Sequence, residues 1–193
     1  MKILAFSDIH GDINYLKEVY RKSKRENIDL IIFAGDLFEF YKYSKRVKEI
    51  LNEFDKKILL IHGNHENQEL INKVCSDNII NIHNKIIEIN KIKFFGYGGG
   101  GFSYQDKRLE FAVEKIKNEL NNWVFVTHQP PFNTNLDKIR NDHVGSKSIK
   151  KIIEIFNPLL NICGHLHENF NVEDKIKRTK IINPGPSGRV VNI

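Results

Sequence analysis

The sequence has little of what marks a secreted or membrane-embedded protein. Its only cysteines are Cys75 and Cys163, so no disulfide framework is implied, and Cys163 falls inside an apolar run. No apolar stretch approaches the ~20 residues that a membrane-spanning helix needs. The first eight residues become polar too early for a secretory signal. We therefore expect a protein of the reducing cytoplasm.

The chain also lacks linkers, internal repeats and low-complexity tracts. Its 193 residues, 40% of them hydrophobic, suffice for one domain that spans the chain without a cap domain. The net charge of +6 comes from basic residues that are interspersed with acidic ones and form no block. Such a charge favours anionic partners, nucleic acid among them. A solvated, lysine-rich exterior is the interpretation we favour.

Five apolar runs are each followed at once by side chains that bind metal ions in proteins. The runs are residues 3–6, 30–34, 58–61, 124–126 and 159–163. Continuous Val/Ile/Leu runs are typical of buried parallel strands, and open α/β sheets bind their ligands just beyond the carboxyl ends of the strands. The side chains that follow the runs are Asp8, His10, Asp36, Asn64, His65, His128, His165 and His167. Five such coincidences in one chain predict a shared site.

Amphipathic spacing predicts helices between these strands. Their apolar positions fall at residues 13–20, 47–54, 70–74, 109–120 and 149–156, and Asp12 and Ser146 are available as N-caps. Residues 86–95 alternate around a tight turn and predict a β-hairpin. Further strands are expected at 170–172, 179–182 and 189–193. This order predicts an α/β fold in which two sheets pack face to face with helices outside.

The predicted ligands suit a pair of divalent ions. Two metals about 3.5–4 Å apart that promote an in-line displacement need a bridging carboxylate, and Asp36 can give one oxygen to each. The remaining ligands are Asp8, His10 and His167 for the first ion, and Asn64, His128 and His165 for the second. Nitrogen and oxygen donors without thiolate suit Mn, Fe, Zn, Ni or Co, and we expect manganese first.

Charge favours a phosphate ester as the substrate. Two divalent ions, two carboxylates and a bridging hydroxide leave a centre of about +1, which attracts an anionic phosphoryl group. We expect the metals to polarise the phosphoryl oxygens and the bridging water to act as the nucleophile. His65 is expected to protonate the leaving oxygen or to stabilise the transition state. Its orienting carboxylate is Glu39, slightly preferred, or Glu66.

Other segments are candidate substrate contacts. His143 precedes Gly145 and Ser146 at a predicted helix start, where backbone N–H groups can accept a phosphate. We include these three residues, together with Asn64, as substrate-binding candidates. The glycines at 98–101 lack the lysine and following helix of a P-loop, so a close backbone approach or a hinge is expected there.

The motifs in this order resemble the calcineurin-like metallophosphoesterase family. They are Asp-x-His at 8–10, Gly-Asp at 35–36, Gly-Asn-His-Glu at 63–66, the isolated His128, and Gly-His-x-His at 164–167. More narrowly, the segments 96–100, 127–131, 143–146 and 183–186 resemble small archaeal and bacterial phosphoesterases of the Icc-related type. The resemblance implies a four-layer α/β/β/α sandwich of two mixed sheets and the ligand assignment given above.

One departure from the family narrows the expected substrate. The arginine-bearing segments of protein Ser/Thr phosphatases are missing, and no arginine occurs between Glu66 and Arg108. A bidentate guanidinium grip on a phosphomonoester dianion is therefore not expected there. We predict a dinuclear-metal phosphohydrolase, best matched to phosphodiesters or small phosphate esters. A nuclease and a non-catalytic interaction module on the same fold are the alternatives; no membrane is expected as a partner, and the oligomeric state is open, a homodimer included.

Overall fold

The computed structural model describes residues 1–193 and confirms the predicted α/β class. The elements of the first half are β1 (Lys2–Phe6), α1 (Ile13–Arg25), β2 (Leu30–Ala34), α2 (Lys45–Asn52), β3 (Ile58–Ile61), α3 (Gln68–Asn72), β4 (Ile79–Asn81), β5 (Lys85–Ile89) and β6 (Ile92–Tyr97). Those of the second half are α4 (Lys107–Ile116), η1 (Lys117–Glu119), β7 (Trp123–Thr127), β8 (Lys138–Ile139), β9 (Asp142–His143), α5 (Lys147–Phe156), β10 (Leu160–Ile162), η2 (His167–Asn169), β11 (Glu173–Ile176), β12 (Thr179–Ile182) and β13 (Arg189–Asn192).

Two mixed sheets form the centre of the molecule. The first sheet has the order β13-β1-β2-β3-β4 and the second sheet the order β11-β12-β10-β7-β6-β5. Strands β1 to β4 are parallel, as are β12, β10, β7 and β6, while the antiparallel β13, β11 and β5 lie at edges. Because parallel strands end at the same edge of a sheet, the loops that follow β1, β2, β3, β7 and β10 are brought together.

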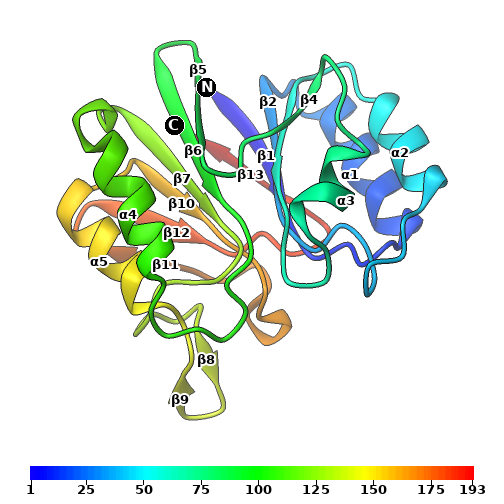
Figure 1. Cartoon of the computed structure of the whole chain (residues 1–193). Helices are drawn as coiled ribbons and strands as arrows, with labels where there is room; N and C mark the ends of the chain where they lie inside the picture. Colours follow the sequence, from blue (N-terminus) through cyan, green and yellow to red (C-terminus); the bar gives the residue numbers. More distant parts are fainter.

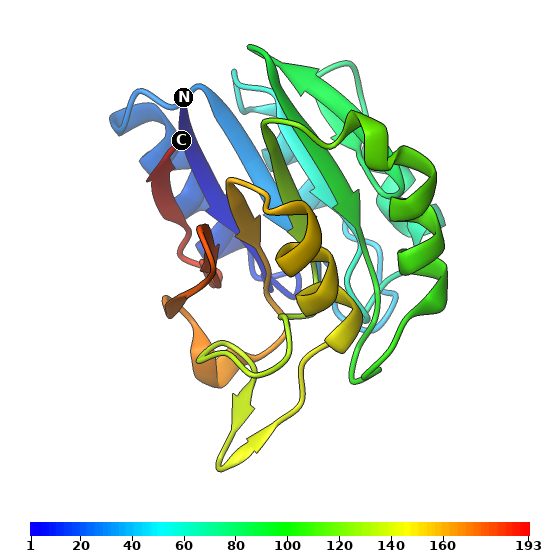
Figure 2. The same ribbon diagram turned by 90° about the vertical axis from the view of Figure 1, so that its left-hand side faces the viewer.

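Helices cover the outer face of each sheet, which gives the four layers that the sequence predicted. Figure 1 shows α1, α2 and α3 on the first sheet and α4 and α5 on the second, and Figure 2 shows the same layers from the side. Alternation along β1 illustrates the packing: Leu4 and Phe6 face the helices, whereas Ile3 and Ala5 join the core between the sheets. A third core lies between the second sheet and α4 and α5.

Local signals in the sequence account for most element boundaries. Asp12 accepts a hydrogen bond from the N–H of Asn14 and Ser146 accepts one from Ile149, so both predicted N-caps are confirmed. The hairpin of β5 and β6 is also confirmed, with Asn90 and Lys91 at positive φ in its turn.

Two expected elements differ from the structure, and two were missed. Helix α4 ends at Ile116, and Leu120 lies beyond the 3-10 turn η1 rather than in the helix. Residues 170–172 are not a strand, because η2 precedes them and Asn171 has a positive φ of 63°, so pairing begins only at Glu173. The short strand β4 and the β8–β9 hairpin carried too few residues to show a periodicity.

None of the helices has the length and apolar character needed to cross a membrane.

Candidate metal centre

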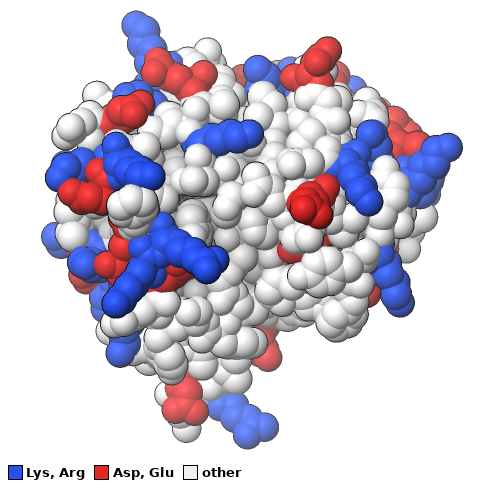
Figure 3. All heavy atoms as spheres, viewed as in Figure 1, with Lys and Arg blue, Asp and Glu red and all other residues white.

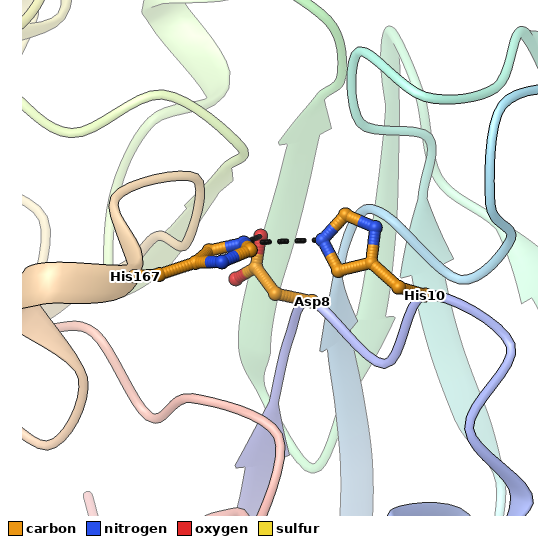
Figure 4. Close-up of side chains that lie close together, drawn as sticks. All are labelled: Asp8, His10 and His167. Carbon is orange, nitrogen blue, oxygen red and sulfur yellow. Dashed lines mark hydrogen bonds and ion pairs between the residues drawn. The ribbon is translucent and has the colours of Figure 1, made fainter.

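The side chains predicted to bind metal meet between the two sheets, at the carboxyl ends of the parallel strands. They follow β1 (Asp8 and His10), β2 (Asp36), β3 (Asn64), β7 (His128) and β10 (His165 and His167). Figure 4 shows Asp8 and His10, from the loop after β1, facing His167 from the loop after β10. The five segments that sequence analysis singled out are thus brought to one place.

The backbone that carries these side chains is strained. Asp8, His10, Asp36 and His165 have φ values of 55°, 49°, 59° and 74°, in the left-handed region that non-glycine residues rarely adopt. Strain of this kind is concentrated at functional sites, where the surrounding structure compensates for it. The left-handed turns point the side chains inward, toward the opposite sheet.

Two glycines let the ligand loops approach one another. A Cβ atom on Gly63 would clash with the carboxylate of Asp36, and one on Gly164 would clash with that of Asp8. Glycine is therefore required at these positions because there is no room for a side chain.

One group of ligand atoms joins the loops after β1 and β10. The oxygen and nitrogen atoms of Asp8, His10 and His167 lie within 4.8 Å of one another. The Nε2 atom of His167 is 3.8 Å from Oδ1 of Asp8 and 3.1 Å from Nε2 of His10. The carboxylate of Asp36 also reaches this group, with Oδ2 at 3.8 Å from Nε2 of His10.

A second group surrounds His128, which is fully buried. Its Nε2 atom lies 3.3 Å from Oδ2 of Asp36 and 2.9 Å from Oδ1 of Asn64. Its Nδ1 atom is 2.8 Å from the carbonyl oxygen of Ala34, which can only accept a hydrogen bond. Nδ1 therefore carries a proton, and Nε2 is the nitrogen directed at the site. Asp36 is common to both groups, as expected of a bridging ligand.

Within this second group, the negative charge of Asp36 is balanced by a positive charge on His128. Burial disfavours the charged form of His128, but the hydrogen bond and the negative charge of Asp36 outweigh it and raise the pKa of His128 to about 9. Burial also opposes ionisation of Asp36, yet His128 lowers the pKa of that carboxyl below its usual range. Without a metal, His128 is thus the positive partner of Asp36. A bound metal would take over that role once His128 loses the proton on Nε2.

Other histidine nitrogen atoms at the site are also available to bind a metal. The Nε2 atom of His165 is buried and has no hydrogen-bond partner. Burial lowers the pKa of His165 to about 3, so its ring is neutral and can donate a lone pair. The facing Nε2 atoms of His10 and His167 can share one proton or a common cation. Donors of this type and number fit transition-metal ions.

His65 lies beside these ligands, and the structure distinguishes the two carboxylates proposed to orient it. Oε1 of Glu39 is 3.7 Å from Nδ1 of His65, and Oε2 of the same side chain is 3.2 Å from Nδ1 of His10. The buried Glu66 instead accepts hydrogen bonds from the N–H groups of Asp36, Phe38 and Gly63. Glu66 therefore holds two ligand loops together, and Glu39 is the carboxylate nearest to His65.

The backbone groups expected to contact substrate already have partners within the protein. The N–H of Gly145 donates to Asp137 and that of Ser146 to the carbonyl of Pro130, so neither N–H group is free for a phosphate. His143 is partly exposed, and its Nδ1 atom lies 2.6 Å from Oδ1 of Asp137. Asn64 reaches the metal centre, as described above.

Asp137 was not recognised from the sequence. It is completely buried, and its carboxylate accepts hydrogen bonds from the N–H groups of Asn133, Thr134 and Gly145 as well as the contact from His143. All but one of these partners are backbone groups, which leave no trace in a residue pattern. Its position four residues after Asn133, a residue that favours turns, is the only local signal.

Comparison with known proteins agrees with this geometry. The calcineurin-like phosphoesterase family model matches residues 1–169. An uncharacterized protein of Methanocaldococcus jannaschii is 35% identical to the chain over 204 residues, which cover 99% of this chain and 91% of that protein.

Solved structures share the fold at low sequence identity. A protein of Thermus thermophilus matches with a TM-score of 0.79 and 17% identity, covering 96% of this chain and 90% of that one. An archaeal phosphodiesterase matches with a TM-score of 0.53 and 20% identity, covering 96% of this chain and 84% of that one. At these identities the likeness supports the four-layer architecture alone.

Proposed function

The chain belongs to the calcineurin-like phosphoesterase family, and from that premise we propose that it is a phosphodiesterase that acts on small phosphate esters with manganese as its preferred ion. The family and the convergent ligand groups support a metal-dependent phosphoesterase. The preference for diesters and for manganese goes beyond them and is our proposal.

The assignment of ligands follows the two groups of donor atoms. Asp8, His10 and His167 would hold one ion, while Asn64, His128 and His165 would hold the other, with Asp36 shared. Bound divalent ions supply Lewis acidity toward the phosphoryl oxygens and lower the pKa of water at the site. The carboxylates supply the negative charge that keeps the ions in place, and the carbonyl of Ala34 fixes the ring of His128.

His65 is proposed as the proton donor to the leaving oxygen. Its side chain is about one-fifth exposed and lines the same hollow as Asp36 and Asn64. The carboxylate of Glu39 lies 3.7 Å from Nδ1 of this ring, beyond hydrogen-bond distance, and is the acidic side chain that faces it. Glu39 is proposed as a positioning residue for His65, with Nε2 left for the substrate.

The observation that supports a diester over a monoester is the lining of the hollow at the metal centre. Its lining residues include no lysine and no arginine. A monoester dianion carries one more negative charge than a diester, and enzymes commonly bind that charge with a guanidinium fork. A diester needs no such partner, so a site built from metal ligands and histidines, without a basic side chain, suits it better.

The test compares two chromogenic substrates on protein loaded with manganese. We expect kcat/KM for bis-p-nitrophenyl phosphate to exceed that for p-nitrophenyl phosphate by about tenfold or more, given the missing guanidinium contact. The opposite preference would overturn the diester proposal. Folded, metal-loaded protein that hydrolyses neither ester nor nucleic acid would support the interaction module instead, and a steep fall of activity on nucleic acid with salt would support a nuclease.

A further inference from the structure

Two exposed phenylalanines contact histidines of the metal centre. The side chains of Phe40 and Phe102 are 66% and 60% exposed. The ring centroid of Phe40 lies 4.3 Å from that of His65, and the ring of Phe102 lies 4.7 Å from that of His165. Aromatic rings are among the side chains that gain most from burial, so their exposure beside the site leaves apolar faces free for a ligand.

The loop that carries Phe102 is anchored by hydrogen bonds on both sides of this residue. Before it, the N–H of Gly99 donates to the carbonyl of His62 at 3.0 Å, and a side chain on Gly98 would clash with His62. After it, the side-chain amide of Gln129 donates to the carbonyl of Ser103 at 3.1 Å. The glycine-rich loop thus makes the close backbone approach expected from the sequence, and it positions Phe102 between the segments that carry Asn64 and His128.

The ring of Phe40 is presented by a strained turn. Phe40 and Tyr41 have φ values of 39° and 61°, which bulky residues rarely adopt. The N–H of Tyr41 donates to the carbonyl of His65 at 2.8 Å and so fixes the turn to the loop that carries the proposed proton donor. Phe40 therefore marks the leaving-group side of the site, whereas Phe102 lies against His165.

The hollow at the metal centre is small, and part of its lining is apolar. Its volume is about 280 Å³, close to the lower end of the range for small-molecule sites. Phe102, Ile139 and Leu166 contribute apolar surface next to the polar groups of Asp36 and His165. Because no basic side chain lines it, the hollow lacks the positive groove that follows a polynucleotide backbone.

The basic residues of the protein gather elsewhere. Figure 3 shows lysine and arginine mainly toward the two sides of the molecule, mixed with acidic residues, with a largely uncharged band between them. On the face shown, the basic residues thus form no continuous positive surface of the kind that binds a long anionic polymer.

We propose that Phe102 is a specificity-determining residue that stacks on a planar aromatic ring in the ester group retained on phosphorus, so that the preferred substrate is a small phosphodiester bearing such a ring. The inference rests on the phosphodiesterase function proposed above. A nucleobase and a simple aryl group share this chemistry, and the experiment separates them.

The experiment uses diesters with one common leaving group. Thymidine 5′-(p-nitrophenyl phosphate), phenyl p-nitrophenyl phosphate and methyl p-nitrophenyl phosphate all release p-nitrophenol, so only the retained group differs. In manganese-loaded protein, Phe102→Ala should raise KM for the thymidine or phenyl ester by about tenfold, the size of a lost ring stack, and change the methyl ester less than about twofold. Phe102→Trp should restore the low KM. An effect on thymidine alone identifies a nucleobase, and an equal effect on phenyl identifies any aryl group.

Phe111→Ala is the matched control. Phe111 is 62% exposed, like Phe102, but lies on α4 away from the site, so its substitution should leave all three esters unchanged. Equal losses for the methyl and aromatic esters in Phe102→Ala, or no loss for any, would overturn the inference while leaving the phosphodiesterase function in place.

A binding measurement separates the inference from the catalytic proposal. Calorimetric titration with the product analogues thymidine 5′-monophosphate, phenyl phosphate and methyl phosphate should show weaker binding of an aromatic analogue, by about tenfold, in Phe102→Ala and unchanged binding of methyl phosphate. If the wild-type protein hydrolyses no diester, the proposed function fails, and the stacking contact is still judged by these affinities. Unchanged affinity for both aromatic analogues would overturn it.

Discussion

The two sheets contribute different chemistry to the metal centre. Loops of the first sheet carry both proposed carboxylate ligands, Asp8 and Asp36, whereas the proposed ligands from the second sheet are all histidines. The negative charge that would attract cations thus comes from one half of the fold, and the second half contributes imidazole rings, which are neutral when they bind a metal. A site of this kind forms only when the two sheets are correctly packed against each other.

Each half also has a buried carboxylate, outside the proposed ligand set, that accepts three hydrogen bonds from loop N–H groups: Glu66 in the first half and Asp137 in the second. Glu66 binds the N–H groups of the loops that carry Asp36 and Asn64, so it fixes metal ligands. Asp137 binds the N–H groups of residues 133, 134 and 145, which lie beyond the last ligand of β7. We call these two buried carboxylates clamps. The Glu66 clamp would support metal binding, whereas the Asp137 clamp supports the loops around residues 133–145.

The largest effect is expected from removing charge on the first sheet. Asp36→Asn should abolish stable metal binding and reduce turnover to the background of the uncatalysed reaction, because the shared ligand and half of the site's carboxylate charge are lost. Asp137→Asn, which neutralises the buried carboxylate of the other half, should keep both metals. Mass spectrometry measures the metal content of each variant, and hydrolysis of bis-p-nitrophenyl phosphate measures its turnover. Full metal content in Asp36→Asn would contradict the ligand assignment.

A smaller effect is expected from the proton donor. His65→Ala should keep the metals and lower kcat by roughly 10²- to 10⁴-fold, the range for loss of general acid catalysis. Glu39→Gln should lower kcat less, since it acts through His65. Steady-state kinetics with metal content as the reference distinguish the two, and an unchanged rate in His65→Ala would remove this residue from the mechanism.

Substitutions of the two clamps, Glu66 and Asp137, should have similar effects on folding stability but different effects on metal affinity. Glu66→Ala and Asp137→Ala each leave buried N–H groups without a partner, and each should lower the free energy of unfolding by roughly 3 kcal/mol. Only Glu66→Ala should also weaken manganese binding, by about 10- to 100-fold, the usual cost of losing a group that orients ligands. Urea unfolding of the metal-free proteins and manganese titration provide the measurements. An equal loss of manganese affinity in both variants would show that Glu66 has no special role in positioning the metal ligands.

The smallest effect concerns pH and the pairing of the two sheets through His128 and Asp36. The pKa of His128 is raised from 6.5 to about 9 and that of Asp36 is lowered from 3.8, so this pair stabilises the metal-free protein fully between pH 3.8 and 6.5, and progressively less as pH rises to about 9 or falls below 3.8. Manganese displaces that proton, so its affinity should rise by up to about tenfold per pH unit over the same window. Calorimetry in buffers of different ionisation enthalpy detects the released proton. Asp36→Asn should lose the pH-dependent stability, and its persistence there would exclude the pair as the cause.

Much of the fold was predictable because its signals are local. Each parallel strand and the ligand after it are adjacent in sequence, and the caps Asp12 and Ser146 act on residues within a turn. The β4 strand and the β8–β9 hairpin are too short for a pattern, and β4 also depends on pairing with β3, which lies about 20 residues earlier in the chain.

The arrangement around the metal ligands was harder to predict for the same reason. Glu39 lies three residues after Asp36 and Glu66 two residues after Asn64, so both are near a predicted ligand in sequence. Only long-range hydrogen bonds from the N–H groups of Asp36 and Phe38 show that Glu66 joins the two loops. The helix start at Ser146 was correctly placed, but its N–H groups are taken by Asp137 and Pro130, which no local pattern reveals. Sequence thus predicts which residues face the site better than what each one contacts.

The division of ligands between the sheets has a mechanical consequence. The sheets share no strand hydrogen bonds, and each group of donor atoms draws on both of them. An ion bound by ligands from both sheets would link the two sheets at the edge that carries the proposed site. Metal binding would therefore reduce the relative motion of the two sheets around the site, and removal of the metal would increase it.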